Sequence, residues 1–459
     1  MKNWFKIFGV GLSALYYIGA VGCSGARFVE PKVEMPAEYL NTTPFTDIYA
    51  EVDPRWWHNF ADPMLDSLVS VALENNRDLE ILYSRVVESR LQLKNARAAL
   101  APTFSLDKEA EGEKLPSEST VQSYTIEPTI SWELDLFGKL RYAAVASRAE
   151  MMAERENMEA MKMSLVAEVA TAYFSILEYD LSLRISEQTL TLRKEAFALT
   201  SLLAIYGEAT ALTLAQNRAL VATAQVAVES YRMARNQAIM SLSTTLGDNP
   251  KYISVDGRKL LDYDIPKEVP VGLPSALLMR RRDIREAYYT LEAAYGDVGV
   301  AIANRFATVT LTGEGGLISS TVKDLFRGNP FGWTATLDIV QPIFTFGRNK
   351  RAVEIAKQKR EQSLLSYENS VITALSEVES ALVGVESYAR QRVGQSQLVK
   401  SNRIYEEFTS ELYKAGEVSY LDVIDAQREY FSAQLSYASL LSSQLSSYVT
   451  LYKALGGGY

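Results

Sequence analysis

Few residues in this chain have types and spacings that could perform chemistry. Its 459 residues include one cysteine and one histidine, which excludes an internal disulfide framework and argues against a histidine-ligated metal centre. No stretch has metal-ligand spacing, a glycine-rich phosphate loop or a nucleophile placed beside a base. The net charge of −9, with no basic stripe, argues against a nucleic-acid partner. We therefore predict a protein that is not an enzyme and uses no cofactor or metal, with its many Asp and Glu residues on solvated helix faces.

The acidic pair Asp422 and Asp425 is one candidate functional feature. The two residues are three positions apart, so on a helix they share one face. From residue type and spacing alone, two solvated acids on an outer helix face are the expected arrangement.

Cys23 is the second candidate. It follows a lysine-bearing start and the apolar run Ile7–Val21, which is short for a membrane span and typical of a secretory signal. Ala20–Val21–Gly22–Cys23 resembles a bacterial lipobox, with Ala20 where the box usually has Leu, and Ser24 after it favours the outer membrane. We predict a signal peptide over residues 1–22 and attachment of acyl chains such as palmitate at Cys23. The alternative is a small buried thiol beside an ordinary cleavage site.

The elements that must position these residues occur twice. Asp78–Leu106 realigns without a gap on Asp283–Leu311, and Gly138 realigns on Gly347, at spacings of 205 and 209 residues. A duplication of this size indicates one architectural unit used twice. We expect each copy to contain a helix, two strands and two further helices.

Each copy carries a pair of predicted strands. From Tyr124 to Leu136 apolar and polar residues alternate with period two, the pattern of a strand with one apolar and one polar face. The expected strands lie at about 103–111 and 123–136 in the first copy, and at about 307–317 and 332–343 in the second.

Two architectures fit these strands. One is a soluble antiparallel sheet packed on helices; the other is a transmembrane β-barrel wall with its apolar face to lipid. Four strands cannot close a barrel, and open edges in lipid would leave backbone groups unpaired. The barrel interpretation therefore requires an oligomer, with eight or twelve strands as the nearest options.

A long helical run follows each strand pair. Gly138–Tyr206 has no proline and no internal glycine, so at 1.5 Å per residue it would be on the order of 100 Å long. The second copy repeats this run up to Gly416, with Gly384 and Gly394 as predicted interruptions. Because Gly207 and Gly416 break the two runs, we expect two helical hairpins with glycine-bearing tips. The alternative is a soluble coiled-coil spacer or filament.

Shorter signals divide the rest of the chain. Asp62 is the predicted N-cap of a helical stretch that continues to about Ala101, where Pro102 stops it, and Ser275 is the predicted cap of the second copy's first helix. The expected parts are a signal peptide (1–22), a lipid-anchored extended segment (23–64), the first repeat (65–247), a linker or equatorial segment (248–274), the second repeat (275–455) and a tail (456–459).

Several motifs occur in an order that resembles one family. They are Trp56–Leu65 (WWHNFADPML), Ala96–Pro102 (ARAALAP), Leu273–Ile284 (LPSALLMRRRDI), Pro342–Arg348 (PIFTFGR) and Leu451–Gly458 (LYKALGGG). Together they resemble the TolC/OprM-type outer-membrane efflux family, in particular its lipoprotein branch, over nearly the whole chain. Arg282 and Thr345 stand where the family usually has Pro and Asp.

The resemblance implies a fold and an assembly. The fold is mainly α with a transmembrane β-barrel, in which three chains of four strands form a 12-stranded barrel continued by a long periplasmic α-helical barrel. The implied function is the exit duct of a tripartite efflux system in the outer membrane of a Gram-negative bacterium, lipid-anchored and extending into the periplasm. The implied partners are two further copies, a periplasmic adaptor (membrane fusion) protein, an inner-membrane pump of RND type and outer-membrane lipid.

The resemblance also assigns roles at the hairpin tips. Asp422, Asp425 and Tyr413 would ring the periplasmic aperture, and three copies of the acidic pair would favour cations. The first tip has Thr213 and Gln216 in place of the two acids. The residues on which the adaptor would dock are Gly207, Glu208, Ala209, Thr210, Gly416, Glu417, Val418 and Ser419.

One feature of the family is missing. Some relatives lock their closed tips with an Arg and an Asp, and here Val418 and Thr213 occupy those positions. That ion pair is therefore not expected, and closure would rest on other contacts.

Two other functions stay open at this point. A duct for type I protein secretion would have the same fold. A lipid-anchored coiled-coil adhesin or spacer would have the anchor and the hairpins without a membrane barrel.

Overall fold

A computed structural model of the protein describes residues 28–41, 46–47, 55–113, 121–255, 257–263, 269–270, 274–327 and 330–457. The predicted signal peptide and Cys23 lie outside these residues.

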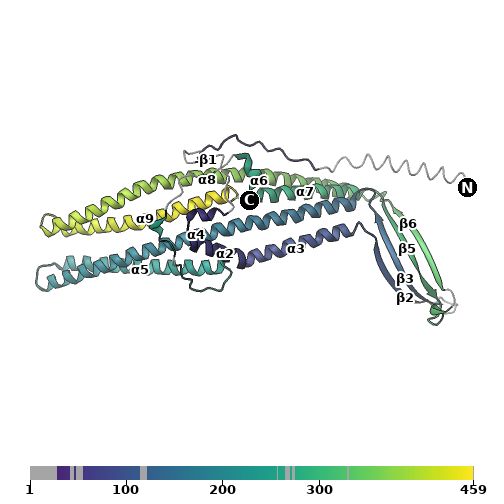
Figure 1. Cartoon of the computed structure of the whole chain (residues 1–459), viewed down its shortest axis with the longest axis horizontal. Helices are drawn as coiled ribbons and strands as arrows, with labels where there is room; N and C mark the ends of the chain where they lie inside the picture. The colour runs from purple at the N-terminus through teal and green to yellow at the C-terminus, as the bar shows by residue number, and fades with distance from the viewer. Residues whose placement is uncertain are drawn as a thin grey trace. The chain divides into compact units, whose positions relative to one another are not determined.

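The two copies of the repeat fold into helices of matching length (Figure 1). α3 and α7 each have 22 residues, α4 and α8 each have 67, and α5 and α9 each have 35. The bounds are α3 Arg77–Ala98, α4 Lys139–Ile205, α5 Ala211–Thr245, α7 Arg282–Ala303, α8 Arg348–Lys414 and α9 Tyr420–Ala454. The duplication in the sequence is therefore a duplication of elements.

The first predicted helix is divided in two. α2 (Pro63–Asn75) begins at the predicted N-cap, because Asp62 accepts a hydrogen bond from the N–H of Met64 at 2.8 Å. It does not continue towards Ala101, since Asn76 is extended, with ψ of 126°. The Asn76 side chain accepts a hydrogen bond from the N–H of Leu79 at 3.0 Å and so starts α3 afresh. Periodicity alone missed this internal cap.

Two further expectations were wrong. Ser275 caps no helix: it lies inside the 3-10 turn Pro274–Ala276 (η4), and α6 (Leu277–Arg280) follows with no side-chain cap. Gly384 and Gly394 do not interrupt α8. A glycine inside a helix costs only about 0.5–1 kcal/mol relative to alanine, which the rest of a 67-residue helix can offset.

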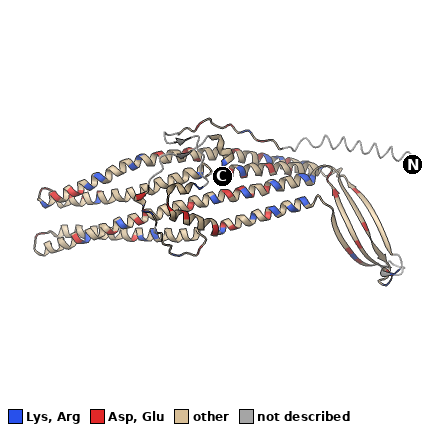
Figure 2. Ribbon diagram, viewed as in Figure 1, with Lys and Arg blue, Asp and Glu red and all other residues tan. Residues whose placement is uncertain are grey.

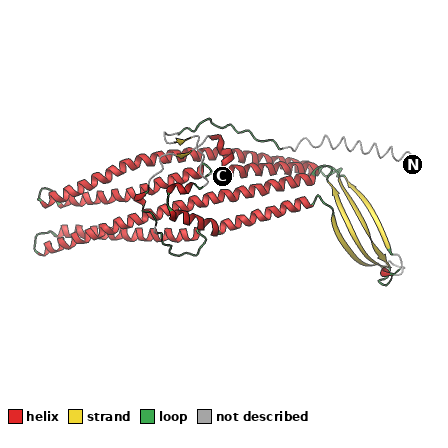
Figure 3. Cartoon of the chain, in the orientation of Figure 1, coloured by secondary structure: helices red, strands yellow, loops and turns green. Residues whose placement is uncertain are grey.

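Four strands form one antiparallel sheet in the order β2-β3-β5-β6 (Figure 3). The strands are β2 Thr103–Glu113, β3 Val121–Leu134, β5 Thr308–Ser319 and β6 Phe331–Val340. The pairing of β3 with β5 joins the two copies of the repeat into one sheet.

The register gathers apolar side chains on one face of this sheet. Trp132 lies opposite Leu311, and Leu311 lies opposite Leu337. These residues are exposed although they are large and apolar, and Trp333 on the same face is 75% exposed. The opposite face carries hydroxyls and acids: Thr103, Ser105, Asp107, Thr125, Glu127, Thr129, Thr310, Thr312, Thr334, Thr336 and Asp338.

The chain forms two compact units, each built from segments of both copies. The first comprises the sheet with the adjoining helix segments, Tyr83–Asn157 and Asp283–Ser370, and, of the N-terminal segment, the described residues 28–33. The second comprises Glu34–Leu82, Met158–Arg282 and Val371–Tyr459, and it contains both hairpin tips. By length and composition α4 could cross a membrane, yet half of its most apolar stretch is buried, as in the core helix of a packed protein.

An aromatic cluster forms part of the core of the second unit. Trp56, in the short helix η2 (Trp56–Phe60), is fully buried and stacks on Tyr452 of α9 with ring centroids 5.2 Å apart. Phe60 packs edge-on against Phe174 of α4 at 5.0 Å. The motif Trp56–Leu65 therefore packs on the motif Leu451–Gly458.

A buried carboxylate ties three segments of the same unit together. Asp62 is 2% exposed, and its Oδ2 accepts hydrogen bonds from the hydroxyls of Tyr173, at 2.6 Å, and Tyr263. Burial and the bond to Asp62 raise the pKa of both phenols.

A short parallel pair of strands also holds the linker. β4 (Val269–Pro270) pairs with β1 (Thr46–Asp47) of the N-terminal segment.

Arg281 joins two further motifs. Its Nη1 donates to the carbonyl of Ala454, near the end of α9, at 3.1 Å and lies 2.7 Å from Glu377 of α8. A cation at a helix C-terminus interacts favourably with the last carbonyls. The LPSALLMRRRDI and LYKALGGG motifs thus hold each other in place.

Candidate functional site

Both hairpin tips make the same backbone turn. Gly207 and Gly416 each have φ of +80°, and no atom lies within 4 Å of a Cβ built at either position. Backbone conformation, and not space, therefore requires glycine there. The N–H groups of Glu208 and Glu417 each donate at 2.9 Å to a carbonyl of the preceding helix, which ends α4 and α8 in the manner of a Schellman motif.

The residues after each turn begin the next helix. Thr210 and Ser419 are N-caps, accepting from the N–H of Thr213 at 3.1 Å and of Asp422 at 3.4 Å. The other predicted docking residues lie in these turns. Glu208 and Glu417 are exposed, and Ala209 and Val418 are half-buried.

Asp422 closes a capping box that its first-tip counterpart Thr213 does not close. Its Oδ2 accepts hydrogen bonds from the hydroxyl of Ser419 at 2.6 Å and from the backbone N–H of Ser419 at 2.9 Å. The side-chain bond first, and the backbone bond second, lower the pKa of Asp422. The spacing Ser-x-x-Asp at a predicted helix start is the sequence signal that could have found this role.

Asp425 lies one turn further along α9 and has a different partner. Its carboxylate is 3.5 Å from Nη1 of Arg428, and both side chains are more than half exposed. Exposed pairs of this kind contribute little to stability. Tyr413, at the end of α8, contacts neighbouring Tyr420 with ring centroids 5.2 Å apart. The three predicted aperture residues thus lie around one tip.

A hydrogen bond between the two hairpins was not predicted from the sequence. The hydroxyl of Tyr420, at the start of α9, donates to Oδ1 of Asn217 on α5 at 2.6 Å. Asn217 is 2% exposed, and its Nδ2 donates to the carbonyl of Thr213 at 2.9 Å, which turns its oxygen towards Tyr420. The two residues are 203 positions apart, so no local pattern marks them.

The two positions of the family's ion-pair lock are uncharged here. Thr213 instead places its Oγ1 2.9 Å from Oγ1 of Thr210 within its own tip.

Lys and Arg are interspersed with Asp and Glu along the described helices (Figure 2).

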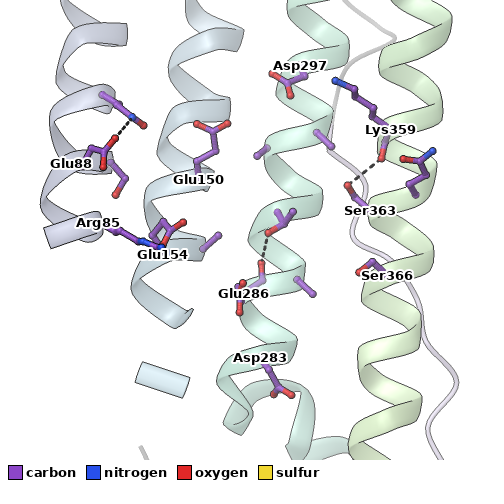
Figure 4. A pocket seen from close by; sticks show the side chains of 18 residues that line it. Arg85, Glu88, Glu150, Glu154, Asp283, Glu286, Asp297, Lys359, Ser363 and Ser366 are labelled. Atoms are coloured by element: carbon purple, nitrogen blue, oxygen red, sulfur yellow. Dashed lines mark hydrogen bonds between the residues drawn. The ribbon is translucent and has the colours of Figure 1, made fainter. Parts of the chain in front are cut away.

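A second group of charged residues converges in the first unit, around a cavity of about 1090 Å³ lined by α3, α4, α7 and α8 (Figure 4). Burial first, and Asp297 second, raise the pKa of Glu150. Burial first, then Glu154 and Asp283, raise the pKa of Glu286. The sequence predicted that such carboxylates would lie on solvated helix faces. Glu150 and Glu286 are instead partly buried at this cavity. Four helices far apart in sequence contribute them, so spacing could not reveal the group.

The cavity was also compared with the ligand arrangements of metal sites. Within the part of the chain that the structure describes, no group of three or more His, Cys, Asp or Glu side chains is arranged to hold a metal ion. Burial raises the pKa of Asp297, which also lines the cavity, and the ammonium group of Lys359 offsets part of that rise.

Known proteins are similar to this chain in sequence and in fold. Residues 68–248 and 273–457 match the family model described as outer membrane efflux protein. The toluene efflux pump outer membrane protein TtgC of Pseudomonas putida is 33% identical over 420 residues, covering 89% of this chain and 86% of that protein.

Two solved channels superpose closely. The outer-membrane channel OprN gives a TM-score of 0.86 at 27% identity, covering 94% of this chain and 99% of its own. The open state of the MtrE outer membrane channel of Neisseria gonorrhoeae gives a TM-score of 0.86 at 29% identity, covering 94% of this chain and 97% of its own.

Proposed function

The chain belongs to the outer membrane efflux protein family, and from this we propose that three copies form the exit duct of a tripartite efflux system. The protein is an outer-membrane channel and, like its family, not an enzyme. In the proposed system it passes substrates from an inner-membrane pump and a periplasmic adaptor to the exterior. The pump is the component that supplies energy.

The sheet is the observation that carries this proposal. One face is apolar across all four strands, and among the described residues β2 and β6 each pair with a single strand. An apolar face without a protein cover suits lipid, but open edges in lipid would leave backbone groups unpaired at several kcal/mol each. Pairing β6 of one chain with β2 of the next removes both edges. Three chains then give twelve strands around a lumen lined by the Thr-rich and acidic face.

The hairpins supply the periplasmic part. We assign adaptor docking to the two tips, Gly207–Thr210 and Gly416–Ser419, because their turns present exposed residues on a defined backbone. An RND-type pump is the proposed inner-membrane partner. The relative TtgC is named as part of a toluene efflux pump, which favours small-molecule efflux over protein secretion for this duct.

Asp422, Asp425 and Tyr413 form the proposed aperture. Three copies of the acidic pair give two rings of negative charge near the tip of the duct, which favour cations at a narrow entrance. The hydrogen bonds from Ser419 stabilise the ionised form of Asp422 and lower its pKa, which is compatible with a fixed negative charge at the aperture.

Cys23 is the proposed lipid attachment site, on the basis of the lipobox-like residues before it. Acyl chains there would contribute about 0.8 kcal/mol per buried CH₂ to membrane attachment. The duct would then be held in the outer membrane by both its barrel and its anchor.

The partners can be identified by cross-linking in cells. A photoreactive residue in place of Glu208 or Glu417 should capture a periplasmic adaptor, whereas the same residue in place of Glu354, an exposed acid on α8, should not. Capture of an adaptor of a protein exporter would support the secretion alternative. Equal capture from all three positions would remove the docking assignment.

The aperture can be tested by conductance in planar bilayers. Replacing both aperture acids, Asp422→Ala with Asp425→Ala, should widen conductance and weaken block by cations, because both acidic rings are lost. The matched control replaces two exposed acids of α8, Glu407→Ala with Glu411→Ala. Unchanged currents in the first variant, or equal changes in both, would remove the aperture assignment.

A further inference from the structure

We propose that an anionic phospholipid of the periplasmic leaflet binds at each junction between chains, held by three cations of α3 and by one cation from α8 of the neighbouring chain. These cations are Arg90, Lys94, Arg97 and Arg351. The inference rests on the trimeric duct proposed above. It follows from a basic stripe on α3 that the internal duplication does not repeat.

The basic stripe consists of Arg90, Lys94 and Arg97. They are at positions i, i+4 and i+7 of α3, so they share one face of the helix, and all three are exposed. No Asp or Glu occurs between Arg90 and Asp107, and no ion pair joins the stripe to a described carboxylate. The stripe is therefore a patch of uncompensated positive charge on a chain whose net charge is −9.

The stripe lies on the opposite side of α3 from the acidic cavity. The α3 residues that line the cavity are Arg85, Glu88, Ser89 and Gln92. At about 100° per residue, Lys94 lies roughly 160° around the helix from Gln92. In the proposed duct the four helices surround the lumen, and the cavity that they line together is on that side. The stripe therefore faces outward.

The stripe begins at the level where the sheet begins. Arg97 is one residue before the end of α3, which ends beside the sheet (Figure 1), and the exposed Phe104 follows in β2. Trp132 of β3 donates its Nε1–H to the Leu100 carbonyl at 3.0 Å, and tryptophan is enriched at membrane interfaces. From Arg97 to Arg90 the stripe covers roughly 10 Å, comparable with a headgroup layer of about 5–8 Å. Clusters of cations at this depth attract anionic lipids.

The second repeat covers the same positions with protein. α7 is offset from α3 by 205 residues at both ends, so the counterparts of the stripe are Tyr295, Gly299 and Ile302. Phe28 packs edge-on against Tyr295 with ring centroids 5.2 Å apart. A Cβ at Gly299 would lie 2.4 Å from the ring of Tyr142 on α4. The face that rings cover on α7 is therefore open and charged on α3.

The neighbouring chain adds the fourth cation. α8 is offset from α4 by 209 residues at both ends, so the counterpart of Tyr142 is Arg351. In a trimer with near sixfold symmetry, the contact of Tyr142 with Gly299 within a chain corresponds to an approach of Arg351 to Lys94 of the next chain. Like charges then face each other across the junction, which is unfavourable unless an anion lies between them.

Two exposed apolar residues support this junction. Within a chain, a Cβ at Gly296 of α7 would lie 2.8 Å from the Cβ of Ala146 on α4. The counterparts of these residues are Leu91 and Ile355, which are 53% and 58% exposed. Packing of Ile355 on Leu91 of the next chain covers both side chains, about one helical turn from the cations.

Helix stability does not account for these cations. A helix dipole favours cations only near the last turn, whereas Arg90 is two turns before the end of α3. Arg351 is in the first turn of α8, where a cation is unfavourable, and that turn holds no acid. Arg351 donates to the Phe346 carbonyl at 3.1 Å, and Glu354, one turn on, pairs with Lys357 at 3.4 Å. A phosphate group would supply the missing charge and accept several N–H bonds.

Native mass spectrometry of the full-length trimer tests the site. Delipidated trimer in a neutral detergent is titrated with phosphatidylglycerol, which carries a net negative charge, or with phosphatidylcholine, which does not. One variant is Lys94→Gln with Arg97→Gln, and a second, across the junction, is Arg351→Gln. The matched control, Arg77→Gln with Arg403→Gln, removes two exposed cations of the second unit.

The unmodified trimer should retain three phosphatidylglycerol molecules, one per junction, with about tenfold or greater preference over phosphatidylcholine. Each site variant should lose about tenfold in affinity for phosphatidylglycerol, and the control should lose none. Equal binding of the two lipids, unchanged affinity in either site variant, or an equal loss in the control would overturn the inference. An intact trimer that retains no lipid would also overturn it and would assign this face to a protein partner.

Failure of this inference and failure of the proposed function give different results. If the unmodified chain forms no trimer and restores no efflux to a strain lacking it, the proposed function fails, and the lipid site fails with it. A trimer that restores efflux but binds the two lipids equally contradicts the lipid site alone.

Discussion

At the scale of single residues, the two tips differ in how their second helix is capped. Thr210 and Ser419 both cap a helix, but of the two equivalent residues Thr213 and Asp422 only Asp422 accepts a hydrogen bond from the backbone N–H of its cap. The same carboxylate is the proposed charge of the aperture. The carboxylate of Asp422 therefore contributes both to the stability of α9 and to the charge of the proposed aperture.

Replacement of the cap should move both properties. Ser419→Ala should cost about 1 kcal/mol of stability at the start of α9, and it should return the pKa of Asp422 towards its usual range because the hydroxyl donor is lost. Hydrogen exchange of the first-turn amides measures the former effect. The pH dependence of cation block measures the latter, and its midpoint should shift to higher pH.

The sign of the pH effect follows from the direction of the shift. Since the folded pKa of Asp422 is lowered, the carboxylate's contribution to stability is present above its unfolded pKa and is lost as pH falls through the folded value. Ser419→Thr keeps the hydroxyl and should behave like the unchanged protein. If Thr and Ala at this position gave the same shift, the capping box would not control the charge.

At the scale of elements, the tip glycines are required by backbone conformation alone. Gly207→Ala and Gly416→Ala should each cost about 1–2 kcal/mol, because a left-handed conformation places Cβ against the following carbonyl. Gly394→Ala, inside α8, should instead stabilise by about 0.5–1 kcal/mol. None of the three glycines has an atom within 4 Å of the added carbon. Whether alanine stabilises or destabilises the protein therefore depends only on the backbone angle φ at that position. Thermal unfolding, followed by circular dichroism, measures these changes. A shift of the unfolding temperature in the same direction for all three variants would contradict the prediction.

The sheet offers a second matched comparison. Leu337 lies on the exposed apolar face and the neighbouring Thr336 on the polar face of β6. In the proposed barrel, Leu337→Lys should destabilise by roughly 2–4 kcal/mol near the bilayer midplane, whereas Thr336→Lys should change little. The yield of heat-modifiable trimer in the outer membrane measures this. Equal losses from the two variants would count against a lipid-facing apolar side.

At the scale of the whole molecule, the anchor and the barrel make separate predictions. Cys23→Ala should abolish incorporation of labelled palmitate, yet the protein should remain a trimer that needs detergent and is heat-modifiable. The barrel, and not the anchor, would then hold it in the membrane. A water-extractable elongated oligomer would instead support a coiled-coil adhesin or spacer.

Local sequence patterns accounted for much of the fold. Period-two alternation indicated the strands, Gly207 and Gly416 marked the hairpin tips, and the realignment of one half on the other revealed the repeat. These features are local or repeat at a fixed spacing, because backbone conformation and the amphipathic period depend on neighbouring residues. The helix break at Asn76 was missed because a side chain caps α3 inside an otherwise helical pattern.

Only the tertiary structure brought together groups that are far apart in the chain. Sequence alone could place Asp422 and Asp425 on one helix face, but it could not pair Tyr420 with Asn217 or gather Glu150, Glu286 and Asp297 around one cavity. Such contacts depend on how helices pack across two repeats, and no fixed spacing encodes them. The sequence determined an element set used twice; packing decided which of the nearly equivalent positions hold the hairpins together.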